Sequence, residues 1–166
     1  MHPDQPNGLY AFSDDKRLLD VDVIHAYLTQ SYWAAGIPRS IVERAIEGSL
    51  CFGIYCQSRQ VGFARAITDR ATFAYLADVF VLESHRGRGL SKQLMSFIQT
   101  HPELKDLRRF MLITKDAHGL YKQFGFTEAI NPDRIMEIRK PDAYAGLATG
   151  ERPDQSFKGS PGHDAA

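Results

Sequence analysis

The sequence predicts a mixed α/β (α+β) domain in which helices cover a sheet. Two observations lead to this prediction. Short runs rich in β-branched and aromatic residues alternate along the chain with segments whose apolar residues recur at helical spacing. The expected order is strand, two helices, three strands, helix, strand, helix, strand. The length of 166 residues suits a single domain with a sizeable core.

The first half of the chain supplies the first strand, two helices and three more strands. Residues 9–13 form the first strand candidate. Asp20 can cap a helix that runs to about Gln30, and Pro38 suits the first turn of a second helix that ends near Gly48. Apolar strands follow at residues 50–57, 60–68 and 73–82, with Ser58 and Arg59 as the hairpin turn between the first two. The third is apolar almost throughout, which predicts burial on both faces, with Asp78 as the exception.

The second half supplies two helices and two strands. A helix begins near Leu90 and stops before Pro102, and a strand follows at residues 109–114. A short helix at residues 116–124 ends at Gly125, a typical C-cap, and residues 134–139 give the last strand. Because the composition then changes to glycine, proline and polar residues, we expect a domain at residues 1–141 and a flexible tail at residues 142–166.

Composition argues against several classes of function. Lysine plus arginine and aspartate plus glutamate each count 20, so the formal net charge is zero, which argues against a nucleic-acid partner. No apolar run approaches the ~20 residues that span a bilayer, and the N-terminus lacks a signal pattern. Cys51 and Cys56 lie five apart in one strand and so face opposite sides. We expect a cytoplasmic protein with no membrane association and no metal.

A glycine-rich, basic loop lies between the third apolar strand and the helix that follows it. This position suits anion binding, because backbone N–H groups converge there and the helix dipole is positive. The loop matches neither a Walker sequence nor the dinucleotide fingerprint, since Lys92 stands at the third glycine position. A tight turn with solvated charges therefore stays open as an alternative. The loop consists of Arg86, Gly87, Arg88, Gly89, Leu90, Ser91 and Lys92.

A second segment carries Tyr121 on the short helix that ends at Gly125. Alone, such a tyrosine is more often a core aromatic than a catalyst. Together the two segments resemble the GCN5-related N-acetyltransferase (GNAT) family. The matching residues are Val81, Arg86, Gly89, Ser91, Leu94, Leu120, Tyr121, Gly125 and Phe126. The resemblance is clearest over residues 49–126, and it implies the GNAT fold, with a mixed, mostly antiparallel central sheet flanked by helices.

The chain departs from the family pattern at three places. Ser91 stands where glycine or alanine usually ends the loop motif, but serine is small and its hydroxyl can bond a phosphate. Glu83 stands where the family often has proline. Thr114, a further cofactor-binding candidate, stands where the family often has asparagine.

The resemblance implies acetyl-coenzyme A (acetyl-CoA) as the co-substrate. Its pyrophosphate is expected on the N–H groups of residues 86–92. Its pantetheine arm is expected along the backbone of Val79, Phe80 and Val81, as an added strand would lie. One of those strand N–H groups can also bind the thioester oxygen, on which negative charge grows during attack.

The resemblance also implies that Tyr121 is the general acid that protonates the leaving thiolate, since a phenol keeps its proton at neutral pH. The general base is not decided, and Asp78 and His118 are the two main candidates. Asp78 is a carboxylate in an apolar strand beside the expected reaction centre, and its alternative role is structural. His118 precedes Tyr121 by three residues and shares its helix face, and its alternative role is packing. Tyr75 lies where relatives sometimes place a base or a water-ordering group.

The acceptor is expected near Tyr32 and Trp33, because in this fold the acceptor site usually involves the first two helices and their connection. Paired aromatics can wall a pocket or stack on a cation, although a hydrophobic plug explains them equally well. Tyr75 and Asp78 are the other expected acceptor-binding residues, and Asp69 and Asp78 can attract an amine. The prediction is an N-acetyltransferase that acts on the primary amine of a small molecule.

Other functions stay open at this point. The acceptor can be a protein N-terminus or a lysine side chain instead of a small molecule. The chain can also be a non-catalytic sensor of acyl-CoA, although the intact Tyr121 argues against that. A module whose basic loop contacts nucleic acid is disfavoured by the zero net charge. The sequence does not decide between a monomer and a homodimer.

Overall fold

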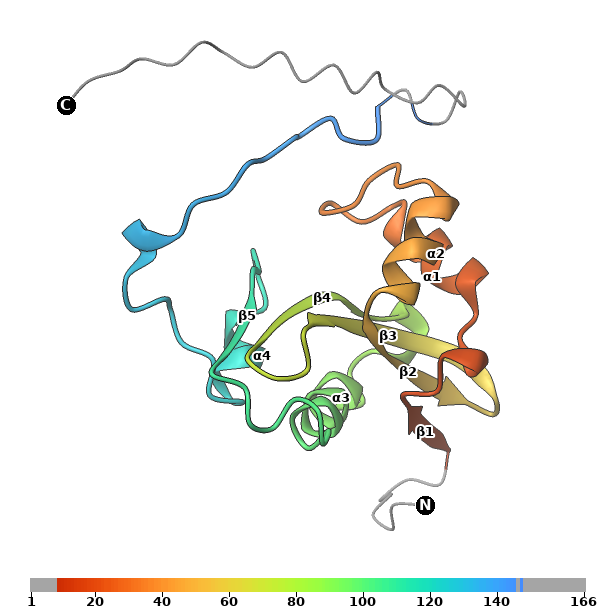
Figure 1. The fold of residues 1–166 in the computed structure, drawn as a ribbon. Helices are drawn as coiled ribbons and strands as arrows, with labels where there is room; N and C mark the ends of the chain where they lie inside the picture. The colour runs from red at the N-terminus through yellow and green to blue at the C-terminus, as the bar shows by residue number, and fades with distance from the viewer. Residues whose placement is uncertain (1–8, 146, 148–166) are drawn as a thin grey trace, which may run out of the picture.

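The computed structural model describes residues 9–145 and 147, which fold around one central sheet (Figure 1). Its strands lie in chain order, β1-β2-β3-β4-β5. The pairs from β1 to β4 are antiparallel, whereas β5 is parallel to β4. This confirms the predicted mixed, mostly antiparallel sheet. The strands are β1 Tyr10–Ser13, β2 Leu50–Cys56, β3 Arg59–Thr68, β4 Phe73–Val81 and β5 Arg109–Leu112.

Helices cover both faces of this sheet (Figure 1). On one face, α1 (Val21–Leu28) and α2 (Arg39–Glu47) bury an apolar cluster that includes Phe63 and Phe80. On the other face, α3 (Leu90–Gln99) and the short α4 (His118–Lys122) close a second cluster, which includes Phe52 and Ile54. Strands β2, β3 and β4 therefore lie between two apolar layers, an arrangement that was predicted for residues 73–82 alone.

The predicted start signals of the first two helices are confirmed. The Asp20 carboxylate accepts hydrogen bonds from the backbone N–H groups of Asp22 at 3.1 Å and Val23 at 3.2 Å. These bonds satisfy two of the N–H groups that have no partner inside the helix. Pro38 directly precedes α2, and Gly48 directly follows it.

The hairpin between β2 and β3 turns one residue earlier than predicted. Gln57 and Ser58 have positive φ angles of 49° and 67°, and Arg59 already belongs to β3. Two consecutive left-handed residues are typical of the tight turn that matches the twist of the flanking strands. Cys51 lies in the cluster under α1 and α2, and Cys56 packs against the opposite one, which confirms that they face opposite sides.

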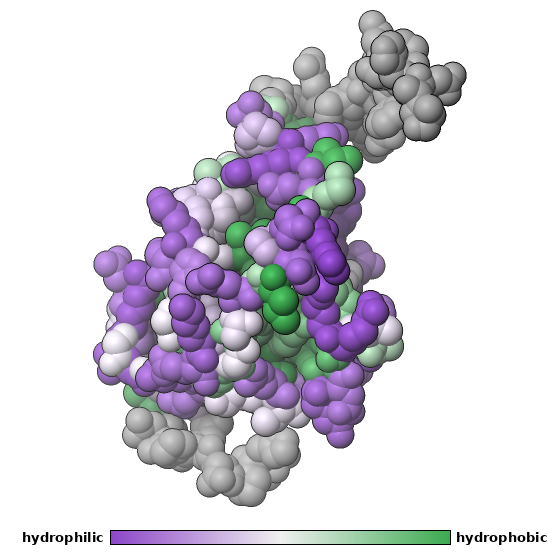
Figure 2. Space-filling model, turned by 90° about the vertical axis from the view of Figure 1, so that its left-hand side faces the viewer, coloured by the Kyte–Doolittle hydropathy of each residue, from purple (hydrophilic) through white to green (hydrophobic). Residues whose placement is uncertain are grey.

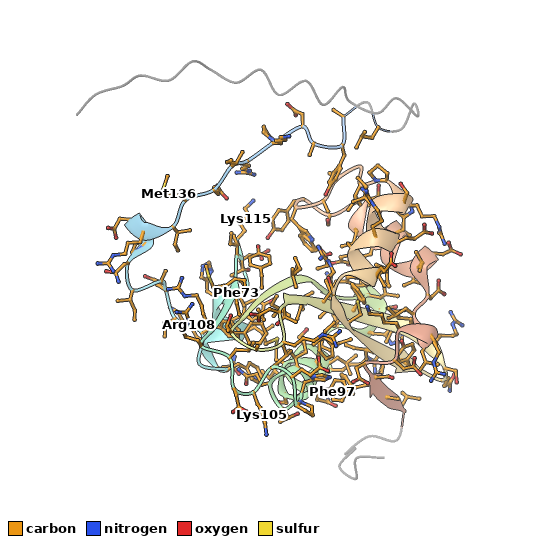
Figure 3. All side chains as sticks on the ribbon, in the orientation of Figure 1. Phe73, Phe97, Lys105, Arg108, Lys115 and Met136 are labelled. Atoms are coloured by element: carbon orange, nitrogen blue, oxygen red, sulfur yellow. The ribbon has the colours of Figure 1, made fainter. Side chains whose placement is uncertain are left out.

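The predicted strand at residues 134–139 does not form. A single 3-10 turn occupies Pro132–Arg134, and no described strand pairs with the residues that follow. Met136 and Ile138 are each 95% exposed. Figure 3 shows Met136 on a segment that leaves the sheet, and Figure 2 shows green hydrophobic side chains among hydrophilic ones on this side of the molecule. An apolar alternation is therefore insufficient here, because a strand also needs a partner for its backbone groups.

Of the expected tail, the structure describes residues 142–145 and 147, and the remainder lies outside the described residues. Within this part, Tyr144 packs against the cluster under α1 and α2. Among the described helices, none has the length and apolar character that crossing a bilayer requires.

Candidate active site

The sheet opens between β4 and β5. The two strands pair only from Phe73 with Arg109 to Leu76 with Leu112. Beyond Leu76, β4 continues to Val81 while no described strand pairs with it on the β5 side. The backbone of the second half of β4 therefore presents an open edge, which can accept an extended ligand as an additional strand would pair.

A bulge lies at the point where the opening begins. In the register with β3, Phe80 is opposite Phe63 and Ala77 is opposite Arg65, so β4 contains one extra residue. Asp78, within this extra stretch, has a φ angle of 55°. Aspartate is among the few residues that tolerate this left-handed conformation. The bulge re-aims the side chains of β4 at this point.

The strand register also shows which residues offer their backbone to the open edge. Leu82 donates its N–H to the carbonyl of Val61 at 2.8 Å. Because inward and outward residues alternate in an antiparallel pair, Val81 and Val79 point their backbone groups away from β3. The backbone groups of Phe80 face Phe63 of β3. Of the three residues expected to bind pantetheine, only the two valines therefore have backbone groups on the open edge.

The basic loop forms a row of backbone donors at the start of α3. Within the described residues, no acceptor contacts the N–H groups of residues 87–92. Gly87 and Gly89 have positive φ angles of 73° and 74°, and a Cβ atom at either would meet nothing within 4 Å. The loop thus needs glycine for its conformation, and the space beside it is open. Free N–H groups at a helix N-terminus are a ready anion site.

The basic side chains of the loop have different tasks. Arg86 is held by the protein, since its Nε donates to the carbonyl of Val81 at 3.0 Å and an Nη donates to the Tyr27 hydroxyl at 3.1 Å. Arg88 and Lys92 are exposed and add positive charge. Ser91 is half-buried, and Leu90 is buried in the core, so its contribution to a ligand is its N–H group.

Tyr121 is 8% exposed and packs on the cluster beneath the sheet, with the Phe126 ring edge-on at 5.9 Å. Its hydroxyl has no hydrogen-bond partner among the described residues, and it keeps some accessible surface, since it is not among the fully buried unpartnered atoms. Burial first, and then the nearby Tyr32 and Asp116, raise the pKa of Tyr121 to about 12. The phenol is therefore neutral and can donate a proton at physiological pH.

Asp78 is fully engaged by its neighbours. One carboxylate oxygen accepts from Arg65 Nε at 2.5 Å, and the other accepts from Trp33 Nε1 at 3.1 Å. The two side chains of the ion pair are largely buried, 17% exposed for Arg65 and 9% for Asp78. Of the two roles considered for Asp78, general base and structural residue, these contacts favour the structural one.

The remaining predicted residues lie around the opening. Burial first, and then the Asp78 carboxylate, raise the pKa of Tyr75, so this phenol is also neutral. His118 is exposed at the start of α4, which does not fit a packing role. The Thr114 hydroxyl accepts the N–H of Ala117 at 3.0 Å and so helps to start α4.

The loop between α1 and α2 faces the loop between β5 and α4. Tyr32 is 60% exposed and Trp33 is 42% exposed, so neither forms a buried plug between the helices. Their rings meet edge-on at 5.0 Å, and Lys115 Nζ lies 5.6 Å from the centroid of the Tyr32 ring. Figure 3 shows Lys115 at the tip of the facing loop. These exposed rings wall the side of the opening where the acceptor was expected.

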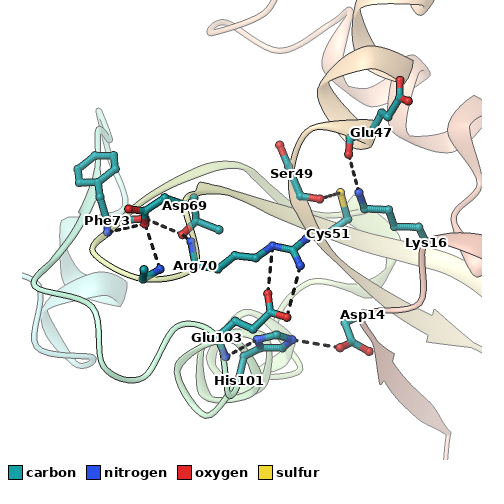
Figure 4. Close-up of polar contacts among 12 residues, drawn as sticks. Asp14, Lys16, Glu47, Ser49, Cys51, Asp69, Arg70, Phe73, His101 and Glu103 are labelled. Carbon is teal, nitrogen blue, oxygen red and sulfur yellow. Dashed lines mark hydrogen bonds and ion pairs between the residues drawn. The ribbon is translucent and has the colours of Figure 1, made fainter.

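Asp69 does not contribute a free charge to this site. Its carboxylate accepts the backbone N–H groups of Ala71, Thr72 and Phe73 and the hydroxyl of Thr72 (Figure 4). The hydroxyl of Thr72 first, and then these N–H groups, hold the pKa of Asp69 well below its usual range. Asp69 closes the turn between β3 and β4, so its predicted role in attracting an amine has no support from its contacts.

Comparison with known proteins agrees with this geometry. Residues 47–128 match the family model of the acetyltransferase (GNAT) domain. An inferred acetyltransferase of Gibberella zeae is 33% identical over 135 residues, which cover 69% of this chain and 76% of that protein. The chain belongs to the GNAT acetyltransferase family. The resemblance seen in the sequence is confirmed.

Solved GNAT structures have the same fold. The crystal structure of an inferred GNAT acetyltransferase from Xanthomonas campestris pv. campestris is 53% identical and superposes with a TM-score of 0.80, covering 82% of this chain and 96% of that one. An inferred acetyltransferase from Clostridium acetobutylicum, solved with acetyl-CoA, is 13% identical with a TM-score of 0.57. It covers 78% of this chain and 94% of that chain, and at this identity it supports the fold alone.

Sequence reasoning missed two residues that contact the candidate site. Arg65 is a cation within the apolar run of β3, and a search for opposite charges on adjacent apolar strands would have paired it with Asp78. No pattern in the sequence indicated a role for Tyr27, because its contact with Phe80 forms only when α1 packs on the sheet. The centroids of the two stacked rings are 3.9 Å apart. The described residues contain no group of three or more histidine, cysteine, aspartate or glutamate side chains suited to a metal ion.

Proposed function

We propose that this GNAT protein transfers an acetyl group from acetyl-CoA to the primary amine of a small molecule. One observation carries the proposal: the unpartnered N–H groups of residues 87–92 lie at the end of the open edge of β4. A ligand that combines an anionic group with an extended arm of amide groups would fit both features, the anion on the N–H groups and the arm along the strand edge. The family membership points to the same ligand.

The residues present fit coenzyme A. The N–H groups of residues 87–92 would hold its pyrophosphate, with Arg88 and Lys92 adding charge. The open backbone groups of Val79 and the N–H of Val81 would pair with the pantetheine amides, since the Val81 carbonyl already accepts from Arg86 Nε. Arg86 would act indirectly, because its side chain already joins Val81 to Tyr27 and so fixes the loop against the strand.

When bound, acetyl-CoA supplies a thioester whose acetyl carbon can be attacked by an amine. The N–H of Val79 or Val81 would stabilise the negative charge that grows on the carbonyl oxygen. As the C–N bond forms and the C–S bond breaks, Tyr121 would donate its hydroxyl proton to the sulfur. Before the attack, the ammonium group of the acceptor would lose one proton to water, because Asp78 is engaged by two donors. As the amide forms, a second proton would leave the nitrogen through water and restore the Tyr121 phenol.

The acceptor proposal rests on the exposed aromatic wall rather than on free carboxylates. Tyr32, Trp33 and Tyr75 offer ring faces and a neutral hydroxyl, which suit a small amine with an apolar or hydroxylated body. The two aspartates that favoured a strongly cationic acceptor are engaged in a turn and an ion pair. A protein N-terminus or lysine is the second candidate, since Tyr32 and Trp33 lie at the surface.

Release of free thiol from acetyl-CoA tests the proposal. The acceptors are spermidine, L-lysine, glucosamine, kanamycin and a peptide with a free N-terminus. Thiol release with a small amine supports the proposal, and release with the peptide alone supports the second candidate. Isothermal titration with coenzyme A runs in parallel. Tight coenzyme A binding without thiol release from any acceptor would indicate the acyl-CoA sensor, and no binding would contradict both functions.

A further inference from the structure

We infer that Trp33 is a positioning residue of the acceptor site, fixed over β4 by its N–H bond to Asp78, and that Asp78 acts as this anchor and not as the general base. The inference rests on the proposed function, because it assigns a task within the acceptor site. It concerns the only tryptophan in the chain, so its state can be measured directly.

The anchor is a chain of contacts across three elements. Trp33 belongs to the loop between α1 and α2, and its Nε1 donates to one oxygen of Asp78 on β4 at 3.1 Å. The other oxygen of Asp78 accepts from Arg65 on β3 at 2.5 Å. Arg65 is itself held, since an Nη donates to the hydroxyl of Ser49 at 3.3 Å. The position of the indole is thus set by the sheet as well as by its own loop.

The backbone at Asp78 is built for this contact. Asp78 lies at the β4 bulge with a φ angle of 55°, a left-handed conformation that few residues with a side chain adopt. Such a conformation is retained where the surrounding structure over-determines the position. The bulge directs the carboxylate to the loop, and the next residue of β4, Val79, offers its backbone to the open edge. The anchor is therefore adjacent to the expected site of attack.

The exposure of Trp33 distinguishes a positioning role from a packing role. A tryptophan that only fills the core would be buried, whereas 42% of Trp33 is exposed. Its neighbours Ala34 and Ile37 are buried and already attach the loop to the core. The bond to Asp78 is therefore not needed to close the loop. It holds a large ring face at a fixed place beside the opening, where an acceptor would contact it.

Contacts through Tyr27 link the Trp33 ring to the loop expected to bind coenzyme A. Tyr27 stacks on Phe80 and lies 6.2 Å from the Trp33 ring centroid. The Tyr27 hydroxyl accepts from Arg86 of the loop at the start of α3. Trp33 thus stands on a surface that includes residues from both the cofactor loop and the acceptor loop. A shift of the indole should affect acceptor binding first and coenzyme A binding little.

Asp78→Asn is the informative variant. Asparagine tolerates a left-handed backbone as well as aspartate does, so the bulge is kept. In an amide, an NH2 group replaces one of the two accepting oxygens, so one of the two donors loses its acceptor. The charged guanidinium of Arg65 competes for the remaining oxygen more strongly than the neutral indole N–H, so Trp33 is the donor that loses its bond. Asp106→Asn is the matched control, since Asp106 is exposed and its side chain makes no hydrogen bond or ion pair with another described residue. Trp33→Phe keeps an aromatic ring and removes only the N–H donor and some area.

The first measurement needs no ligand. Acrylamide quenching of Trp33 fluorescence should become steeper in Asp78→Asn, with emission at longer wavelength, and should be unchanged in Asp106→Asn. Circular dichroism confirms that each variant is folded. Unchanged quenching in Asp78→Asn means that the carboxylate does not hold the indole, and this result overturns the inference whatever the chemistry of the protein.

The second measurement separates positioning from proton transfer, with the amine that gives the highest thiol release. Asp78→Asn and Trp33→Phe should each raise the acceptor KM about three- to tenfold, the range that one hydrogen bond contributes. kcat and the Kd for coenzyme A should stay within about twofold, and the double variant should match the more affected single one. A kcat loss on the order of 10² or more in Asp78→Asn, with loss of the acidic limb of the pH profile, would identify a base and overturn the inference.

The two proposals fail separately. A protein that binds no coenzyme A and releases no thiol contradicts the proposed function, whereas the ligand-free quenching still measures the link between Trp33 and Asp78. An active protein in which both variants leave the acceptor KM unchanged contradicts the positioning role, and the proposed function stands.

Discussion

The hydroxyl of Tyr121 has an environment suited to giving up a proton only during the reaction. It is buried enough to raise its pKa to about 12 and has no partner among the described residues. Removing the hydroxyl should leave the ring contact with Phe126 and the local fold intact, because phenylalanine has the same shape. The loss should therefore appear in catalysis alone.

We predict that Tyr121→Phe lowers kcat about 10²–10³-fold, the usual contribution of a general acid, with the Kd for coenzyme A unchanged. Thiol release and isothermal titration provide the two values. Tyr55→Phe is the matched control, since it is the same chemical change at a buried tyrosine of β2 that lies outside the proposed site. Wild-type turnover in Tyr121→Phe would remove the assignment.

Tyr55 allows a second prediction at the scale of one residue. Its hydroxyl is buried without a hydrogen-bond partner among the described residues, and its ring lies against Gly53, where a Cβ atom would be 2.3 Å from the hydroxyl. A buried hydroxyl without a partner costs free energy, so Tyr55→Phe should raise the free energy of unfolding by about 1 kcal/mol. Urea denaturation followed by circular dichroism measures the change. A decrease would show that the hydroxyl has a partner outside the described residues.

At the scale of elements, the loop before α3 is expected to bind the pyrophosphate of coenzyme A mainly through its free backbone N–H groups. Gly89 is the N-cap of α3 and has a φ angle of 74°. A β-branched residue there would strain the backbone and project into the anion site, although it would touch no protein atom within 4 Å. Arg88, in contrast, contributes an exposed charge, which is worth little in water.

Gly89→Val should therefore weaken coenzyme A binding by about tenfold or more, whereas Arg88→Ala should weaken it by less than about fivefold. Isothermal titration at two salt concentrations gives both affinities, and only the Arg88 contribution should depend strongly on salt. A larger effect of Arg88→Ala would mean that side-chain charge, and not the backbone, binds the pyrophosphate.

The elements also show where sequence reasoning succeeds and where it stops. The strands, the helix caps and the glycine loop were predictable, because each depends on local periodicity or on a residue with a particular conformational property, such as Asp20 or Gly89. The contact between Arg65 and Asp78 and the position of Trp33 were not, because they arise from a register and a bulge that join distant segments. The prediction of a strand at residues 134–139 was wrong for the same reason. The alternation of apolar residues is a local feature, whereas a strand also needs a neighbouring strand from a distant part of the chain.

At the scale of the whole molecule, two buried tyrosines in different parts of the fold couple stability to alkaline pH. Folding raises the pKa of Tyr55 and of Tyr121 from 10.0 to about 12, mainly by burial. Each phenol therefore holds its proton more tightly in the folded state. Their stabilisation is complete below pH 10 and is lost as the pH rises from 10 through 12. Cys51, raised from 9.0 to about 11, loses its contribution between those values.

We predict that the melting temperature falls steeply between pH 10 and pH 12 and that Tyr55→Phe and Tyr121→Phe each make this fall shallower. Thermal melts of the three proteins over this pH range provide the comparison. Parallel curves for wild type and both variants would show that these phenols do not control the alkaline limb.

The parallel pairing of β5 with β4 has a consequence for the order in which the protein folds. Short turns join β2, β3 and β4, whereas β5 reaches β4 only after the crossover through α3, and it pairs over a short stretch. Closing such a long loop costs more chain entropy than closing a hairpin, so β5 should join last. Substitutions such as Phe110→Ala should then speed unfolding with little change in the refolding rate. The cleft would mature in the final folding step, and a ligand that spans it would act as a late folding partner.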